Sequence, residues 1–162
     1  MPLAVRVATP AEHEAVGRLT LHAYVASGIL TEDDFYAEHL VDAAGRAQDG
    51  EVYVADLEDV VVGTVTFCPE GSPLRELAGP GEAEFRMLAV SPSARRQGVA
   101  EALVRRVVER ARELGCTAVV LSSQPVQEDA HRLYGRLGFH RTPDKDWSPV
   151  PGVDLLGFRL PL

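Results

Sequence analysis

Hydrophobic and polar residues follow two different periods in the middle of the chain. Residues Glu84 to Val90 (EFRMLAV) form a short, mostly apolar run bounded by glycine and proline residues, which is typical of a buried strand. Beyond this run, apolar residues recur every three or four positions, the spacing of one helix face, at Val99, Leu103, Val107, Ala111 and Leu114. Gly115 then supplies the stop that helices commonly use. The pattern predicts a strand, a turn and an amphipathic helix in succession.

Shorter patterns on both sides predict the rest of the fold. β-branched and apolar residues predict strands at 3–8, 51–57, 60–67, 117–123, 139–141 and 155–160. Helices are predicted to begin at Thr9, Thr31 and Val126, and Gly45 and Gly138 close the last two. Because a helix separates residues 84–90 from 117–123, these two strands are expected to be parallel. The order β-α-α-β-β-β-α-β-α-β-β indicates a mixed α/β (α+β) domain with a single sheet.

The predicted helices also have predicted buried faces. The first would bury Val16, Leu19 and Ala23, and the second would bury Phe35, Leu40 and Val41. Residues 69–81 hold three prolines and three glycines, which predicts a loop directly before the central strand. Residues 143–152 are expected to be rich in turns.

Composition narrows the class of protein. The chain has 162 residues, enough for one domain (1–162) with a sizeable core. Its formal net charge of −8 argues against general binding to nucleic acid or to an anionic membrane, because both rely on basic surface. Two cysteines without metal-ligand spacing predict reduced thiols and a cytoplasmic location. No apolar run approaches membrane-spanning length, so a soluble monomer or homodimer is expected.

The turn before the long helix has the features of an anion site. A helix start exposes unpaired N–H groups and the positive end of the helix dipole, and Gly98 lets a ligand approach the main chain closely. Arg95 and Arg96 add full positive charges. The chain contains neither the G-x-G-x-x-G dinucleotide fingerprint nor the Gly-Lys-Ser/Thr of a Walker loop. A pyrophosphate is the kind of group that this turn suits.

Two motifs resemble those of a known family. Arg95-x-x-Gly98-x-Ala100, after a strand and opening a helix, resembles the [Gln/Arg]-x-x-Gly-x-[Gly/Ala] signature of the GNAT superfamily of N-acetyltransferases. Gln127-x-x-Ala130-x-x-Leu133-Tyr134-x-x-Leu137-Gly138-Phe139 resembles a second block of that family, with Gln127 where many members have asparagine. The resemblance implies the GNAT fold, in which one mixed sheet of about seven strands is flanked by about four helices.

The same resemblance implies a binding site for acetyl-coenzyme A (acetyl-CoA). The main chain of Leu88, Ala89 and Val90 would pair with the pantetheine amides as an added strand does. The pyrophosphate would lie on the segment that opens the helix, formed by Arg95, Arg96, Gln97, Gly98, Val99 and Ala100. Gln127 completes the expected cofactor-binding residues. No metal is expected, because the five histidines show no ligand spacing.

The implied reaction, direct transfer of an acetyl group from a thioester to an amine, needs a base for the ammonium and a proton for the departing thiolate. Glu84 lies six residues before Val90, where several protein-acetylating members of the family carry a catalytic glutamate, and it is the candidate base. The alternatives for Glu84 are a solvated strand-end carboxylate or a partner for Arg86. Tyr134, at the family's tyrosine position, is the candidate acid, and its alternative is packing against residues such as Phe139.

In this family the acceptor pocket is built from the first helices and the late loops, and here these segments are rich in carboxylates. Tyr24, Asp33 and Phe35 are the candidate acceptor-binding residues, with further acidic residues at 32, 34, 70, 76 and 82. Acidic walls predict a small cationic amine as the acceptor. The alternative is a domain that binds acyl-CoA without turnover, as a sensor or partner module. A basic helix that binds nucleic acid is disfavoured by the net charge.

Overall fold

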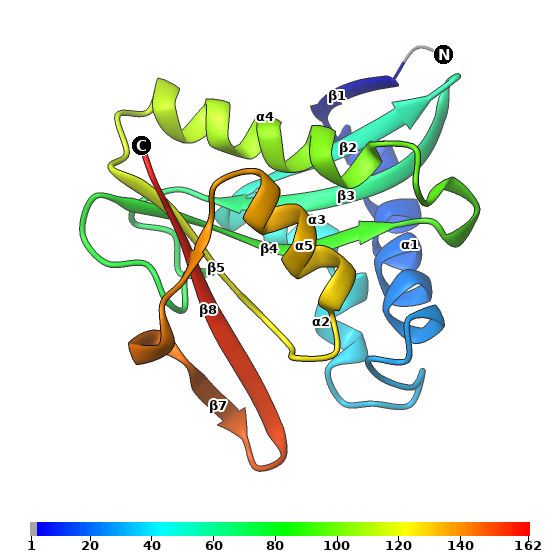
Figure 1. Cartoon of the computed structure of the whole chain (residues 1–162). Coiled ribbons are helices and arrows are strands. Elements are labelled where there is room, and N and C mark those ends of the chain that lie inside the picture. Colours follow the sequence, from blue (N-terminus) through cyan, green and yellow to red (C-terminus); the bar gives the residue numbers. More distant parts are fainter. Residues whose placement is uncertain (1–2) are drawn as a thin grey trace.

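The computed structural model describes residues 3–162, and Figure 1 shows one twisted sheet between two layers of helices. The strands are β1 (Leu3–Val7), β2 (Glu51–Leu57), β3 (Val60–Cys68), β4 (Glu82–Val90), β5 (Ala118–Ser123), β6 (His140–Arg141), β7 (Trp147–Val150) and β8 (Val153–Pro161). The helices are α1 (His13–Ala26), α2 (Ala37–Val41), α3 (Ala43–Asp49), α4 (Val99–Glu113) and α5 (Glu128–Arg136). The mixed α/β architecture predicted from the sequence is confirmed.

The strand order explains how a site forms at the centre of the sheet. The strands lie in the order β1-β2-β3-β4-β5-β8-β6, and β7 pairs with β8. β4 and β5 are parallel, as predicted, and α4 connects them. Their pairing extends only to Glu84 and Val120, although β4 continues to Val90 and β5 goes on pairing with β8. The two central strands therefore separate towards the end of β4.

Each face of the sheet has its own core. On one face, α4 and α5 pack over the strands, and α1, α2 and α3 lie on the other (Figure 1). The predicted apolar face of α4 is confirmed for four residues, which are buried: Val99, Leu103, Val107 and Ala111. Leu114, just beyond the helix, is 45% exposed. The second core is smaller and joins α1 and α3 to β2, with Val16, Val52 and Val54 among its buried residues.

The single helix predicted between residues 31 and 45 is wrong. The chain forms two short helices there, α2 and α3, which are separated at Asp42 (φ −85°, ψ 62°). The Asp42 carboxylate accepts a hydrogen bond from the Gly45 N–H (2.9 Å), and this cap starts α3 as a new helix. Of the residues predicted to be buried there, Leu40 is buried, whereas Phe35 and Val41 are 71% and 40% exposed.

A close contact between α1 and α2 shapes the first layer. At Gly17, an added Cβ would lie 2.1 Å from the Val41 carbonyl oxygen, so a larger residue does not fit. The buried face of α1 runs through Val16, Gly17, Thr20 and Ala23, and Leu19, which was predicted to be buried, is only half-buried. The same helix packs against β4 and so brings its C-terminal end next to the separated strands.

The C-terminal part contains a strand that the sequence pattern did not predict. Residues 147–150, expected to be part of a turn-rich segment, form β7 and a hairpin with β8 that extends beyond the main sheet (Figure 1). Pro149 lies within β7, which is an edge strand, where a missing N–H is tolerated. The proline-rich composition therefore concealed a strand.

Candidate active site

A groove of about 790 Å³ lies between the end of α1, the end of β4 and the starts of α4 and α5. Its walls include most of the residues predicted to bind the cofactor: Leu88, Ala89, Val90, Arg95, Arg96, Gly98, Val99, Ala100 and Gln127. Gln97 does not line the groove, and its side-chain amide lies 3.5 Å from the Ser93 carbonyl oxygen. The roles of these residues stay predictions, but the fold brings nearly all of them to one surface.

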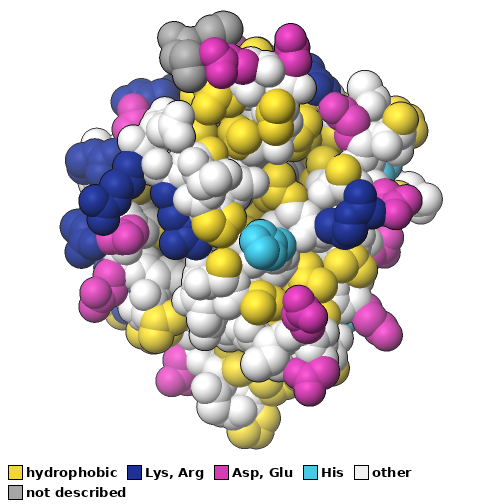
Figure 2. All heavy atoms as spheres, turned by 90° about the vertical axis from the view of Figure 1, so that its right-hand side faces the viewer, with side chains coloured by type: hydrophobic (Ala, Val, Ile, Leu, Met, Phe, Trp, Pro, Cys, Tyr) yellow, Lys and Arg dark blue, Asp and Glu magenta, His cyan; other side chains and the backbone are white. Residues whose placement is uncertain are grey.

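The groove is locally basic in an acidic protein. Figure 2 views the side of the molecule that carries α1 and the turn before α4, and basic side chains gather at one edge of this face beside exposed apolar ones. Two of the arginines that line the groove are neutralised, because Arg132 pairs with Asp129 and Arg136 with Glu101. The ion pairs within residues 3–162 involve neither Arg95 nor Arg96. These two arginines therefore carry positive charges that no ion pair within residues 3–162 offsets, and Glu128 is the carboxylate of the groove without an ion pair.

The turn before α4 presents main-chain donors. Arg96 (φ 63°) and Gly98 (φ 79°) both have left-handed backbone conformations, and an added Cβ at Gly98 would meet no atom within 4 Å. The Ala102 N–H donates to the Gly98 carbonyl oxygen (3.0 Å), so the N–H groups before Ala102 have no carbonyl partner within the helix. Arg95 donates to the Ser27 hydroxyl (2.9 Å) and ties the turn to the end of α1. Such a turn can hold a phosphate group.

β4 bends beside the groove. Met87 has a φ of 56°, and the register with β3 shifts between Thr64 and Thr66, which marks a β-bulge. β4 pairs with β3 up to its last residue, Val90. Its pairing with β5 ends at Glu84 in the described part of the chain. The main chain from Leu88 to Val90 therefore has one edge free to pair with an extended ligand.

Gln127 closes the turn that leads into α5. Its side-chain Oε1 accepts hydrogen bonds from the Gln124 N–H (2.9 Å) and from the Ser123 hydroxyl (3.0 Å). The same hydroxyl lies 3.0 Å from His131 Nε2, one turn further along the helix. Glutamine in place of the asparagine of many family members thus still fixes the start of α5 beside the groove.

Glu84 is fully buried and anchors the loop before β4. Its Oε1 accepts hydrogen bonds from three successive N–H groups of that loop, those of Glu76 (3.0 Å), Leu77 (2.8 Å) and Ala78 (2.9 Å). Its Oε2 is also buried and has no hydrogen-bond partner within residues 3–162. Burial raises the pKa of this carboxyl, although the three N–H groups act in the opposite direction.

The surroundings of Glu84 match neither structural alternative considered from the sequence. The carboxylate is 0% exposed, so it is not solvated. Arg86 pairs with Glu76 (3.3 Å) and not with Glu84. Glu84 instead holds the residues 76–78 against the start of β4, close to where β4 and β5 separate.

Tyr134 lies in an aromatic cluster beneath α5. It is 3% exposed, and its ring centroid lies 5.9 Å from that of Phe85, 5.8 Å from Phe139 and 5.6 Å from Phe158. Burial raises the pKa of its hydroxyl well above the usual range, so the phenol keeps its proton at neutral pH. Aromatic packing of Tyr134 is therefore confirmed, and its role as a proton donor stays a prediction.

Of the three candidate acceptor-binding residues, Tyr24 lines the groove, whereas Asp33 and Phe35 do not. Asp33 is exposed, and a hydrogen bond from the Thr31 hydroxyl lowers its pKa. Three of the other expected acidic residues are held by this chain itself: Glu70 by the Gly81 N–H, Glu76 by Arg86 and Glu82 by Arg159. Most of the acidic side chains expected to bind the acceptor are therefore already bonded to other groups of the protein.

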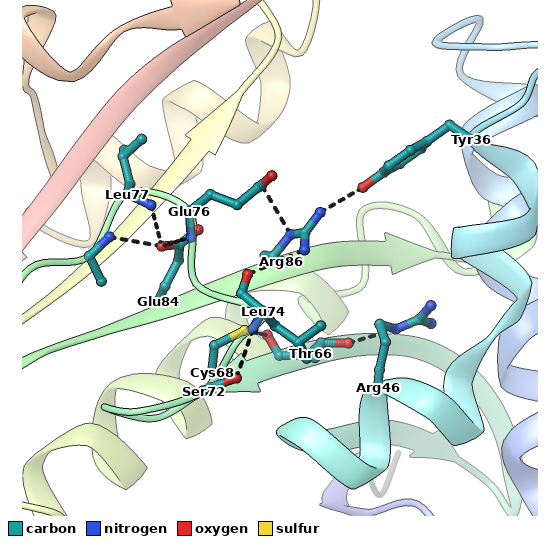
Figure 3. Close-up of polar contacts among 11 residues, drawn as sticks. Tyr36, Arg46, Thr66, Cys68, Ser72, Leu74, Glu76, Leu77, Glu84 and Arg86 are labelled. Atoms are coloured by element: carbon teal, nitrogen blue, oxygen red, sulfur yellow. Dashed lines mark hydrogen bonds and ion pairs between the residues drawn. The ribbon is translucent and has the colours of Figure 1, made fainter. Parts of the chain in front are cut away.

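A polar cluster that the sequence pattern did not single out lies on the α1 side of β4 (Figure 3). Arg86 on β4 donates to the Tyr36 hydroxyl (2.8 Å), and burial raises the pKa of that hydroxyl. Arg46 on α3 donates to the Thr66 hydroxyl (3.1 Å) on the neighbouring strand. Alternation along β4 could have indicated Arg86, since it shares a face with Glu84. No pattern in the sequence marks Arg46.

Three further properties bear on the type of site. Within residues 3–162, no helix is long and apolar enough to cross a bilayer. The same residues contain no group of three or more His, Cys, Asp or Glu side chains placed to hold a metal ion, and a metal-free reaction stays a prediction. Both cysteines are free, with Cys68 buried and Cys116 half-buried.

Comparison with known proteins places the chain in a family. The family model described as "Acetyltransferase (GNAT) family" matches residues 15–139. The rat (Rattus norvegicus) protein named N-acetyltransferase 8F1 is 39% identical over 93 residues, which are 57% of this chain and 41% of that protein. The chain thus spans less than half the length of the curated relatives that it matches.

Solved structures share the fold over the whole chain. An acetyltransferase of the GNAT family from Staphylococcus aureus superposes with a TM-score of 0.79 and 14% identity, covering 99% of both chains. The protein yncA from Salmonella typhimurium, solved with its cofactor acetyl-CoA, has a TM-score of 0.72 and 22% identity, covering 100% of this chain and 95% of that one. Because the family model matches most of the sequence and the fold agrees, the chain belongs to the acetyltransferase (GNAT) family.

Proposed function

We propose that the protein is an N-acetyltransferase that moves an acetyl group from acetyl-CoA directly to a primary amine. The observation that carries the proposal is the groove, in which the open edge of β4 at Leu88 to Val90 lies beside the anion-binding turn at Arg95 to Ala100. The name of the rat relative and the acetyl-CoA in the yncA structure support this use of the groove.

In this proposal, acetyl-CoA supplies the activated acyl group, and the groove residues hold and orient it. Main-chain groups of Leu88 to Val90 bind the extended pantetheine arm as an added strand would be bound. The N–H groups between Arg96 and Ala100 bind the pyrophosphate, and the unpaired charges of Arg95 and Arg96 strengthen that binding.

Two buried residues would move protons. Glu84 is the proposed base, because burial raises the pKa of its carboxyl and Oε2 is the oxygen left to accept the proton. Tyr134 is the proposed acid for the departing thiolate, because its phenol stays protonated and it follows the groove residue Leu133 on α5, although it does not itself line the groove.

The remaining expectations are also part of the proposal. The acceptor amine is expected to arrive as a small cation, since an alkyl amine with a pKa near ~10 is protonated at neutral pH. A cytoplasmic enzyme, acting as a monomer or homodimer without nucleic acid or membrane, is expected from the charge and from the two cysteines.

The test is calorimetric titration with acetyl-CoA, followed by measurement of thiol release in the presence of a panel of amines. Binding at about micromolar concentration together with amine-dependent release would support the proposal. Absence of acetyl-CoA binding would overturn it.

A second candidate function is a non-catalytic module that binds acyl-CoA. The observation that favours it is the Glu84 side chain, of which Oε1 is fully engaged by the N–H groups of residues 76–78. Acetyl-CoA binding without release of thiol to any amine would support this second function over the first.

A further inference from the structure

Arg46 is a buried cation with unused hydrogen-bonding capacity. The residue is 5% exposed, its Nε donates to the Thr66 hydroxyl, and its Nη1 donates to the carbonyl oxygens of His39 (2.6 Å) and Leu40 (3.0 Å). Its Nη2 is buried and has no partner within residues 3–162. Burial lowers the pKa of the guanidinium, which reflects the cost of an incompletely paired charge.

A second arginine lies close to it. Arg86 is mostly buried, and its guanidinium is held by the Tyr36 hydroxyl, the Leu74 carbonyl oxygen (3.3 Å) and the Glu76 carboxylate. Arg86 is near enough to Arg46 for its positive charge to contribute to the lowered pKa of the Arg46 guanidinium. Figure 3 shows Tyr36 pointing to Arg86, with Arg46 projecting from α3 on the same side of the sheet.

This cluster adjoins the groove. Tyr24 lines the groove and lies within electrostatic reach of Tyr36 and of both arginines. Arg86 precedes the groove residue Leu88 by two positions on β4, across the bulge at Met87. An acceptor whose amine reaches the middle of β4 could therefore extend an anionic group towards Arg86 and Arg46.

The carboxylates around these two arginines already have partners, and no ion pair within residues 3–162 involves Arg46. Glu76 pairs with Arg86, the Asp42 carboxylate caps α3 through the Gly45 N–H, and Glu84 is engaged by the loop before β4. Burial raises the pKa of Tyr24 and Tyr36, so both are neutral hydroxyls at physiological pH. Arg86 thus has an ion pair, whereas the Asp42 carboxylate acts on Arg46 only through space, and Arg46 Nη2 keeps an unused donor within residues 3–162.

We propose that the cluster of Arg46 and Arg86 binds a carboxylate of the acceptor, so that the acceptor is an amino acid and not a simple amine. This inference rests on the proposed acetyltransferase function and specifies its substrate class. The carboxylate accepts a hydrogen bond from Arg46 Nη2 and charge-assisted contacts from Arg86, and the ammonium end points to the middle of β4. The cationic amine expected from the sequence is retained, with an anionic group added.

The experiment compares three acceptors with the same side chain: L-leucine, L-leucinamide and 3-methylbutylamine. With saturating acetyl-CoA, we expect kcat/KM for the amino acid to exceed those for the other two by about tenfold to hundredfold, the usual effect of a buried charge-assisted hydrogen bond. A wider set of amino acids in matched pairs with their amides covers other side chains. Amides acetylated as well as the acids throughout the set would overturn the inference while leaving the acetyltransferase function intact.

Two variants assign the preference to the cluster. Arg46→Lys and Arg86→Gln should each reduce the acid-to-amide ratio of kcat/KM by about tenfold, with unchanged affinity for acetyl-CoA as a check of folding. Arg110→Gln is the matched control, because Arg110 is a partly buried arginine hydrogen-bonded to Glu51 away from the groove. The control should keep the ratio. An unchanged ratio in both cluster variants would contradict the assignment.

Discussion

Glu84 illustrates how one side chain can serve architecture and chemistry together. One carboxylate oxygen binds three loop N–H groups, and the other has no partner within residues 3–162. Burial dominates these contacts and raises the pKa above its ordinary value of 4.5. The folded protein therefore holds this proton more tightly than the unfolded chain does. By linkage, this group's contribution to stability decreases as pH rises from 4.5 through the raised pKa.

Replacing Glu84 with glutamine removes this titration, while the amide oxygen can still accept from the loop. We expect the free energy of unfolding of Glu84→Gln to decline less than that of the parent protein as pH rises from 4.5 through the raised pKa of Glu84. Urea denaturation at a series of pH values measures this difference. If Glu84 is also the base, the variant loses the acidic limb of the kcat/KM profile.

Glu82 on the same strand provides a control of opposite sign. Burial alone would raise the pKa of Glu82, but hydrogen bonds from the Gly79 N–H and Arg159 lower it overall. Its stabilising contribution is present above pH 4.5 and is lost as pH falls through the lowered pKa. Below pH 4.5, the free energy of unfolding of Glu82→Gln should therefore decrease less with falling pH than that of the parent protein. Parallel profiles for the Glu84 variant and the parent would contradict the raised pKa of Glu84.

The packing of Tyr134 and its proposed role in proton transfer can be tested separately. Its ring packs against Phe85, Phe139 and Phe158, and none of the hydrogen bonds recorded within residues 3–162 involves its hydroxyl. Tyr134→Phe keeps the ring and removes the proton. We expect kcat to fall about tenfold to hundredfold, with KM for acetyl-CoA and the urea midpoint unchanged.

The control for this experiment is Tyr53→Phe. Tyr53 is also buried, and its hydroxyl donates to Glu51 (2.8 Å) away from the groove. This variant should lose stability and keep kcat. Full kcat in Tyr134→Phe would exclude the phenol as the acid.

At the scale of secondary structure, the strand, turn and helix of residues 84–114 carry the proposed cofactor site. The turn depends on Gly98, which has a φ of 79° and leaves open space where a side chain would project. Gly115, beyond the other end of the helix, has a φ of 76° and is equally open. The two glycines thus share a left-handed backbone conformation, but Gly98 lines the groove and Gly115 does not.

This pairing gives a matched test of the anion site. Gly98→Ala and Gly115→Ala should each lower the free energy of unfolding by about 1 kcal/mol, because alanine is disfavoured in the left-handed conformation. Only Gly98→Ala should weaken acetyl-CoA binding, by about tenfold, since its methyl group would occupy the approach to the N–H groups. Calorimetry and urea denaturation measure both effects. Equal affinities for the two variants would argue against binding at this turn.

The sequence predicted these elements because their signals are local. Apolar spacing from Val99 to Ala111 and the glycine at 98 determine the helix and its start with little help from tertiary contacts. The break at Asp42 was missed because a side-chain cap there competes with an apparently continuous helix. β7 was missed because it is short and contains Pro149, and proline is more typical of turns than of strands.

The same distinction applies to the candidate site. The predicted cofactor-binding residues of the groove lie in or just before two compact motifs, so the sequence could indicate them together, whereas most of the α1 residues that also line the groove were not predicted. Arg46 and Arg86 come from segments forty positions apart, and only the folded sheet brings them to one side of β4. The loop contacts of Glu84 likewise depend on the path of residues 69–81, which no periodic pattern describes.

At the scale of the whole molecule, the distribution of charge is uneven. The formal net charge is −8, which on its own would repel an anionic cofactor. Within the groove, Arg132 and Arg136 already form ion pairs. Arg95 and Arg96 form none within residues 3–162, so their charges are available to a ligand. We therefore expect the affinity for acetyl-CoA to depend on these two positive side chains, because the negative net charge of the protein repels the anionic cofactor.

Neutralising both arginines tests this balance. Arg95→Gln/Arg96→Gln should weaken acetyl-CoA binding by about tenfold or more at low ionic strength, since two charge-assisted contacts to phosphate are lost. Because salt screens such contacts over a Debye length of about 10 Å at 0.1 M, the parent protein should lose affinity as salt is added and the double variant much less. Arg132→Gln is the control, because Arg132 lines the same groove and is already paired with Asp129. Calorimetric titrations at several salt concentrations compare the three proteins. If the double variant kept the salt dependence of the parent, the phosphates would have to lie elsewhere, and the assignment of the turn before α4 would fail.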